Sequence, residues 1–180
     1  TMSSNIKWSY QKRFAAGNVL INTGLMFGYK KVGKDAEGKD IYEIVEDEAA
    51  LIRRIYREYL AGITVTQICK ELEDEGIKTK LGKSKWYCRT VLNILQNEIY
   101  IGNATLGKTF KPDVLSKHRM KNTGQVPMYY VEGSHPAIIE KEMYDAVQQE
   151  IRFRADGGNT VAGQSKYTSK YPFSGLLICG

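Results

Sequence analysis

The sequence predicts an α+β fold, in which a small helical domain containing a helix-turn-helix-like pair is flanked by β-hairpins. Three observations support this class. Apolar residues recur every three or four positions in successive segments between residues 46 and 96, which is typical of helices packed on a core. Shorter apolar runs separated by turn-forming residues lie before and after these segments. The length of 180 residues suits one main domain.

The first hairpin is expected between Leu25 and Val45, with Gly38 in the turn because glycine tolerates a positive φ angle. A helix should follow, since the acidic segment 46–48 suits the positive end of a helix dipole. Its buried face is expected to consist of Leu51, Ile52, Ile55, Tyr56 and Tyr59. Its opposite face is expected to carry Arg53, Arg54, Arg57 and Glu58.

A second helix is expected after Gly62, because Thr64 to Gln67 has the form of a capping box, and Gly76 should end it. Its buried face is expected to consist of Val65, Ile68, Cys69 and Leu72. A third helix is expected from about Trp86 to Gln96, burying Val91, Leu92, Ile94 and Leu95. These two helices have the order of a helix-turn-helix, although the connection between them is longer than the shortest turns.

The pattern changes to β after Asn97. Two strands are expected within 100–110 and 126–133, joined by a basic loop at 111–125, so that the segment forms a wing-like hairpin. A last helix is expected from about Lys141 to Arg154, with a linker after it. Its buried face is expected to consist of Met143, Tyr144, Val147 and Ile151.

The distribution of charge suggests a polyanionic partner. Lys and Arg outnumber Asp and Glu by 26 to 20, and the isoelectric point is about 9.1. The connection before the third helix carries four cations and no acid, namely Lys78, Lys80, Lys83 and Lys85. Such a cluster suits contacts with DNA phosphates.

The polar face of the third helix is expected to contact DNA bases. Arg89 has bidentate geometry that matches guanine, and Asn93 matches adenine in the same way, while Thr90 and Gln96 could assist at the margins. A solvated face of an ordinary amphipathic helix would carry the same residue types, so for any single residue both interpretations stay open.

A second basic stretch lies in the wing-like segment. It comprises Lys108, Lys111, Lys117, His118, Arg119 and Lys121, against the single acid Asp113. Basic loops of this kind reach a phosphate backbone or a minor groove, so Lys108, Lys111 and Arg119 are candidate DNA contacts. A disordered surface loop would have the same composition.

Several other functions lack the residues they need. No apolar run could span a membrane, and the first residues do not resemble a signal peptide, so we expect a cytoplasmic chain without a membrane partner. Cys69, Cys88 and Cys179 are too widely spaced for a disulfide framework or a complete zinc site. The sequence contains no catalytic set of carboxylates, Ser/His/Asp or metal ligands, and His118 and His135 are expected to have structural or surface roles.

Several motifs occur in a specific order along the chain. They are GLMFGY (24–29), EAALIRRIY (48–56), GIT (62–64), GIKT (76–79), Trp86, ILQNEIYIG (94–102), HPAII (135–139) and SGLLICG (174–180). In order and spacing they resemble the recombinase domain of large serine recombinases. One departure is Leu25-Met26, where many members of that family carry prolines.

The resemblance implies a domain organisation. Residues 1–17 would end a helix that links domains, 18–155 would form the recombinase DNA-binding domain, and 156–180 would be a linker and the truncated start of a zinc ribbon. A zinc ribbon needs four ligands, and Cys179 alone cannot hold the ion, so zinc is expected only in a full-length protein. The serine-dependent catalytic domain is also expected to be absent, so this chain by itself would not be an enzyme.

The resemblance also implies a function. Full-length relatives integrate or excise mobile elements by cutting two DNA partners, and such a parent would act as a dimer or tetramer on DNA. The chain is therefore expected to recognise a double-stranded attachment site, with the third helix in the major groove. The alternative is a basic helical module that docks an acidic protein partner or regulates assembly of the recombinase.

Overall fold

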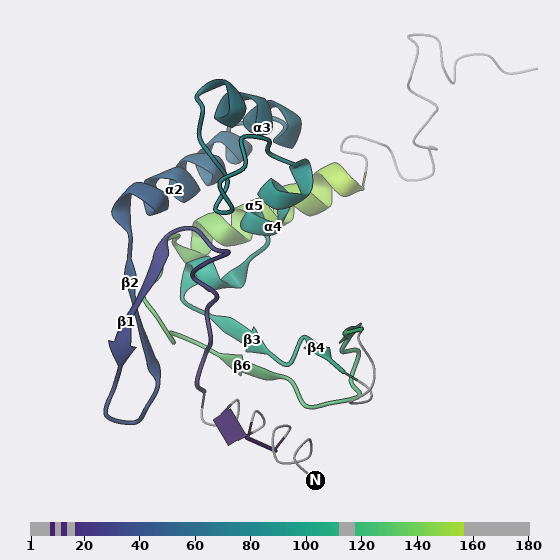
Figure 1. Cartoon of the computed structure of the whole chain (residues 1–180). Coiled ribbons are helices and arrows are strands. Elements are labelled where there is room, and N and C mark those ends of the chain that lie inside the picture. Colours follow the sequence, from purple (N-terminus) through teal and green to yellow (C-terminus); the bar gives the residue numbers. More distant parts are fainter. Residues whose placement is uncertain (1–7, 10–11, 14–16, 112–117, 157–180) are drawn as a thin grey trace, which may run out of the picture.

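The computed structural model describes residues 8–9, 12–13, 17–111 and 118–156. Figure 1 shows the helices gathered at one end, with two β-ribbons extending from them. The elements are β1 (Tyr29–Lys34), β2 (Asp40–Ile44), α2 (Glu46–Leu60), α3 (Val65–Asp74), α4 (Cys88–Leu95), the 3₁₀ helix η1 (Glu98–Ile101), β3 (Ala104–Leu106), β4 (Thr109–Phe110), β5 (Met120–Lys121), β6 (Tyr129–Val131) and α5 (Lys141–Ala155). The predicted α+β class is confirmed.

The first hairpin forms as predicted, but its strands begin later than the apolar run does. β1 and β2 pair antiparallel with Tyr29 opposite Ile44, and residues 23–28 form turns and bends ahead of β1. Gly38 has a φ of 79° in the connecting turn, where the Asp35 carboxylate accepts hydrogen bonds from the backbone N–H groups of Glu37 and Lys39. The side chain of Asp35 therefore stabilises the turn that glycine makes possible.

Helix α2 is the centre of the core. Its residues Ala49, Ile52, Ile55 and Tyr56 are fully buried, and Leu51 is half-buried, so the predicted apolar face is confirmed. The hydroxyl of Tyr56 lies 3.1 Å from the carbonyl oxygens of both Ile94 and Leu95. Because the last carbonyls of a helix have no partner within it, this hydroxyl ties the end of α4 to α2.

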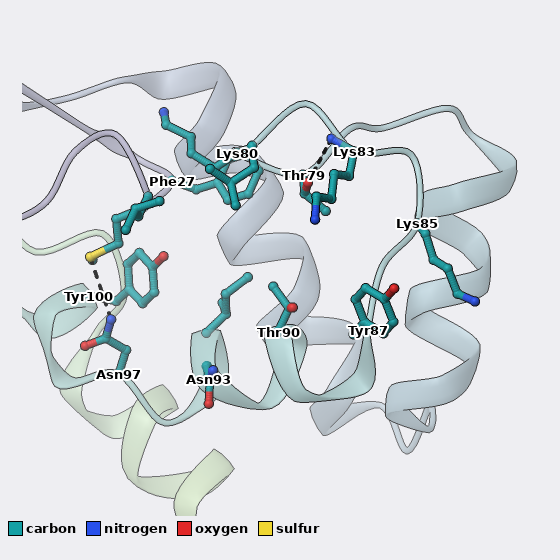
Figure 2. Close-up of a pocket in the computed structure, with 14 residues that line it drawn as sticks. Phe27, Thr79, Lys80, Lys83, Lys85, Tyr87, Thr90, Asn93, Asn97 and Tyr100 are labelled. Carbon is teal, nitrogen blue, oxygen red and sulfur yellow. Dashed lines mark hydrogen bonds between the residues drawn. The ribbon is translucent and has the colours of Figure 1, made fainter. Parts of the chain in front are cut away.

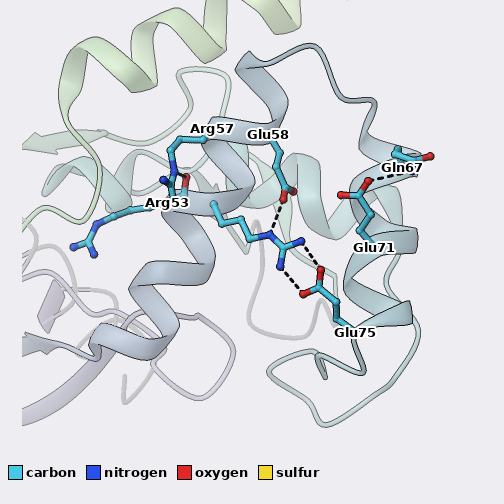
Figure 3. Close-up of polar contacts among 7 residues, drawn as sticks. Arg53, Arg57, Glu58, Gln67, Glu71 and Glu75 are labelled. Atoms are coloured by element: carbon cyan, nitrogen blue, oxygen red, sulfur yellow. Dashed lines mark hydrogen bonds and ion pairs between the residues drawn. The ribbon is translucent and has the colours of Figure 1, made fainter.

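The face of α2 opposite the core carries the charged residues that the pattern placed there, and some of them contact α3. Arg54 donates hydrogen bonds to Glu58 on the same helix and to Glu75, the residue that caps the end of α3, at 2.6 Å in each case (Figure 3). The hydrogen bonds from the Arg54 guanidinium hold the pKa of the Glu75 carboxyl below its ordinary value and outweigh the opposing effect of desolvation. This network therefore links α2 to α3 through charged side chains on the face of α2 opposite the core.

Helices α3 and α4 form the predicted pair, with two differences at their starts. Thr64 accepts a hydrogen bond from the backbone N–H of Gln67 at 3.2 Å, but the Gln67 side chain donates to Glu71, so only half of the capping box forms (Figure 3). Helix α4 begins at Cys88 instead of Trp86. The buried Trp86 donates its backbone N–H to Glu73 and its indole N–H to the carbonyl of Ile77, which keeps the chain extended up to Tyr87.

The wing-like hairpin is present but is shorter than predicted. Strand β3 pairs with β6, and β4 pairs with β5 further along the same ribbon. The expected strand at 100–110 is wrong at its start, because residues 98–101 form η1. Asn97 caps this helix by accepting from the backbone N–H of Ile99, and Gly102 ends it with a φ of 81°. Tyr100 is thereby buried in the core.

The last helix, α5, packs against α2 as its apolar spacing predicts, with Val147 fully buried and Met143, Tyr144 and Ile151 half-buried. Near its end, Arg154 donates hydrogen bonds to the carbonyl oxygens of Tyr59 and Ile63. Of the expected helix before Gly17, residues 8–9 and 12–13 are described and are helical. Among the described residues, no helix combines the length and apolar character needed to cross a membrane.

Among the described glycines, Gly28 is the one where an added Cβ atom would come nearest to a neighbouring side chain. Its φ is 90°, and a Cβ atom there would overlap Cδ1 of Ile138. We expect Gly28→Ala to lower the free energy of unfolding by about 2–4 kcal/mol, because strain and overpacking add. Gly38→Ala is the matched control, since Gly38 has a similar φ but open space around it, and should cost only about 1 kcal/mol. Urea denaturation measures both, and equal losses would contradict the packing argument.

His135 should make the stability depend on pH. It is buried, with Nε2 2.6 Å from the carbonyl of Ile99 and Nδ1 2.8 Å from the hydroxyl of Ser134. Burial lowers the pKa of its imidazole, and the Ile99 carbonyl offsets only part of this effect. Between the folded pKa and the unfolded value of about 6.5, the unfolded chain binds more protons, so stability falls as the pH drops below about 6.5.

The test is urea unfolding of the wild type and of His135→Gln at about pH 7.5 and pH 5.5. Glutamine does not titrate, so the variant should lose less of its free energy of unfolding between the two pH values. An equal loss in both proteins would show that other groups cause the pH dependence.

Candidate nucleic-acid interface

A groove of about 290 Å³ lies along the polar face of α4. One wall is the connection between α3 and α4, which contributes Thr79, Lys80, Leu81, Lys83, Lys85 and Tyr87. The floor includes Thr90, Asn93 and Ile94 of α4, and the other wall is the segment Leu25 to Phe27 before β1 (Figure 2). The structure therefore brings three parts of the chain together around the helix that the sequence predicted to contact DNA.

The connection is an ordered turn. The backbone N–H of Thr79 donates to the carbonyl of Lys83 at 2.8 Å, and the N–H of Lys83 donates back to the Thr79 hydroxyl at 3.1 Å. A further bond from the N–H of Gly82 to the carbonyl of Thr79 closes the turn, and Gly82 has a φ of 76°. Leu81 and Lys83 are exposed at this turn, so their side chains are presented from a defined backbone.

The four lysines of the connection do not have the same environment. Lys78, Lys83 and Lys85 are exposed, whereas Nζ of Lys80 lies 2.7 Å from the carboxylate of Glu48 on α2. The Lys80 side chain retains only 21% of its exposure, and its ammonium also lies over the ring of Phe27. The connection contains no acid of its own, so this partner of Lys80 could not be predicted from the sequence.

The predicted base-contacting residues lie on one side of α4 and its C-terminal end. At about 100° per residue, Arg89, Asn93, Gln96 and Thr90 fall within an arc of roughly 120°. Arg89, Asn93 and Gln96 are exposed and Thr90 is half-buried. Thr90 and Asn93 line the groove, while Arg89 and Gln96 lie outside its lining.

Helix α4 is held at its C-terminal end by α5 as well as by Tyr56. The hydroxyl of Tyr144 donates to the carbonyl of Gln96, and the amide of Gln148 donates to the carbonyl of Leu95 at 2.7 Å. Each bond satisfies a carbonyl that the helix leaves without an internal partner. The polar face of α4 therefore has a fixed orientation relative to the core.

The second basic stretch is only partly available. Lys108 forms an ion pair with Glu98, whose side chain is 15% exposed. Burial raises the pKa of the Glu98 carboxyl, but the Lys108 ammonium and hydrogen bonds from backbone N–H groups together lower it below its ordinary value. Lys111 and Arg119 are exposed, and residues 112–117, which include Asp113 and Lys117, lie outside the described residues.

The apolar part of the groove was not predicted from the sequence. Leu25, Leu81 and Tyr87 line it and remain largely exposed, and Asn97 lies at its end with its amide against the sulfur of Met26. No periodic signal marks these positions, because they lie in turns and at a helix boundary. The one signal in the sequence was Leu81 itself, an apolar residue within the lysine-rich connection.

Metal ligands do not gather in the part of the chain that the structure describes. No group of three or more His, Cys, Asp or Glu side chains there could hold an ion. Cys69 and Cys88 are free thiols, the first buried and the second exposed. Cys179, the residue considered for a zinc ribbon, lies outside the described residues.

Comparisons with known proteins agree with this architecture. The sequence model of the Recombinase family matches residues 46–154, which is more than half of the chain. A protein of Bacillus subtilis (strain 168), named as a candidate DNA recombinase, is 27% identical over 90% of this chain. The chain spans only 32% of the length of that relative.

Two solved structures share the fold. The match to the crystal structure of an LSR–DNA complex covers 84% of this chain and 40% of the chain in that structure, with a TM-score of 0.54 and 24% sequence identity. A second structure comes from work on the sequence requirements of the Listeria innocua prophage attP site. The match covers 86% of this chain and 54% of the chain in that structure, with a TM-score of 0.56 and 24% sequence identity.

These matches define the class of protein. A recombinase domain covers residues 46–154, and the fold is that of the two solved structures, as expected from the sequence motifs. The chain belongs to the Recombinase family.

The different environments of Lys80 and Lys83 lead to a stability prediction. Lys80→Met removes the partner of the partly buried Glu48 carboxylate and should lower the free energy of unfolding by about 1–2 kcal/mol. Lys83→Met, its matched control on the exposed side of the same turn, should change it by less than about 0.5 kcal/mol. Urea denaturation measures both, and equal effects would mean that the ion pair does not stabilise the fold.

Proposed function

We propose that this chain binds double-stranded DNA of an attachment site, with α4 in the major groove, during integration or excision of a mobile element. The observation that carries the proposal is the groove along α4, where exposed cations of an ordered turn lie beside polar side chains suited to base edges. An α-helix fits the major groove, and phosphates flank that groove on both sides.

The lysines of the connection divide into two roles. Lys78, Lys83 and Lys85 are exposed and would neutralise phosphates, which fixes the position of the domain on the duplex. Lys80 instead holds the connection against α2 through Glu48, and its contribution to binding is indirect. Of the four lysines that the sequence predicted to contact phosphates, three therefore keep that role.

Base reading is assigned to the exposed face of α4. Arg89 offers two donors to the O6 and N7 atoms of guanine, and Asn93 offers a donor and an acceptor to adenine. Thr90 and Gln96 flank them and would contact the margins of the site. A fixed helix suits this task because little backbone freedom remains to be lost on binding.

The wing would supply a second region of contact. Lys111 and Arg119 are exposed and could reach the phosphate backbone or the minor groove. Lys108 is tethered to Glu98, so it would act at most as a phosphate contact close to the ribbon. The assembly of a full-length parent as a dimer or tetramer on DNA, and its cutting of DNA, belong to the same proposal.

The solved relatives support this function without establishing it. One of them is a complex with DNA, and the other concerns a prophage attP site. At 24% identity they share the fold, so the roles of individual side chains must come from this chain's own groove.

The experiment is selection of a preferred duplex from a random-sequence library, followed by fluorescence anisotropy with the selected and a scrambled duplex. A preference for the selected duplex that weakens with salt is expected, with each contacted phosphate adding about −0.9 to the slope of log K against log salt. Arg89→Ala should weaken binding to the selected duplex by about 1–3 kcal/mol and reduce the preference.

Two controls complete this design. Arg57→Ala removes an exposed arginine of α2 and should leave the preference unchanged. Lys83→Ala should weaken binding to both duplexes and reduce the salt slope by about 1. Binding that depends weakly on salt, with no selected sequence, would favour the alternative of a module that docks a protein partner.

A further inference from the structure

Large apolar side chains are exposed inside the same groove that carries the cations. Leu25 is 60% exposed, Leu81 is 65% exposed and Tyr87 is 58% exposed, and all three line the groove. Phosphates and hydrogen-bonding base edges give such side chains nothing to contact. They therefore need an explanation beyond charge and polar base reading.

These side chains occupy defined positions. Leu81 lies in the turn that the paired hydrogen bonds between Thr79 and Lys83 close, and the backbone N–H of Leu25 donates to the carbonyl of Asn22 in a second turn at 3.0 Å. Tyr87 immediately precedes α4, with Nζ of Lys85 5.6 Å from the centre of its ring. The apolar surface is thus built onto the two walls of the groove.

The groove's chemistry limits what could cover this apolar surface. None of its described lining residues is acidic, and Lys83 and Lys85 lie on the same wall as Leu81. A molecule that binds in the groove must therefore carry negative charges and have apolar groups within a few ångströms of those charges. In the major groove of DNA, the C5-methyl group of thymine is the apolar group, and it lies between two rows of phosphates.

We infer that Leu81, together with Leu25 of the same groove lining, contacts thymine methyl groups and gives this domain a preference for A·T pairs. The inference rests on the proposed function, since it names the base chemistry recognised at the same site. Asn93, on the floor of the groove, suits adenine, so the polar and apolar contacts select the same kind of base pair. Leu81 is thereby a specificity residue that hydrogen-bonding patterns would not reveal.

The test compares the selected duplex with the same duplex in which every thymine is replaced by deoxyuridine. This change removes methyl groups and leaves every hydrogen-bonding group of the bases in place. The wild type should bind the deoxyuridine duplex more weakly, by about fourfold for each methyl group that it contacts. Leu81→Ser should bind both duplexes equally, and Leu81→Met should retain the discrimination because its side chain stays apolar.

The matched control is Leu60→Ser, which removes an exposed leucine at the end of α2 outside the groove and should discriminate like the wild type. Equal binding of both duplexes by the wild type would overturn the inference while leaving the proposed function intact. Discrimination that persists in Leu81→Ser would also overturn it, since the effect would then come from DNA shape or another contact. Failure of the library selection would instead reject the proposed function itself.

Discussion

The carboxylate of Glu48 sets the geometry of the groove. It accepts a hydrogen bond from the backbone N–H of Gly28 at 2.7 Å and pairs with the ammonium of Lys80 at 2.7 Å. Gly28 follows one wall of the groove and Lys80 belongs to the other, so a single side chain in the first turn of α2 connects both. A carboxylate is favourable there, because it lies near the positive end of the helix dipole and its two partners form charge-assisted bonds.

The core beneath this carboxylate orients the helix that the groove exposes. Tyr56 and Tyr144 contact carbonyl oxygens at the C-terminal end of α4, and Trp86 anchors the chain just before its first turn. All of these contacts come from side chains that are buried or half-buried in the packed helices. The polar face of α4 is therefore positioned by folding, and its backbone needs little further ordering in a binding step.

The charges of the domain serve two purposes that composition cannot separate. Lys80, Lys108 and Arg54 pair with acids brought in from other elements, and these pairs join the connection, the wing and α3 to the rest of the fold. Lys78, Lys83, Lys85 and Arg89 remain exposed on or near the groove. The net charge of +6 describes the whole chain, in which acids offset most of the cations. The described lining of the groove contains lysines and no acid, so the groove is more strongly positive than the net charge suggests.

The sequence by itself determined the α+β class, the order of the elements and the apolar faces of α2 and α3, because these depend on periodicity and on local turn and cap residues. It also indicated the family through the order of its motifs, and it placed Arg89, Thr90, Asn93 and Gln96 together because they lie within three turns of one helix. The 3₁₀ helix η1 was not predicted, and α4 begins at Cys88 where a start near Trp86 was expected, since the burial of Trp86 and Tyr100 overrides local preference there.

Only the tertiary structure decided which charges are free and what surrounds the polar helix face. The pairing of Lys80 with Glu48 joins residues 32 positions apart, and Leu25 reaches the groove from a segment far from Leu81 in the chain. Contacts over such separations arise from the packing of whole elements around α2, and no local pattern in the sequence records them. For that reason the cationic half of the groove could be predicted from the sequence, and its apolar half could not.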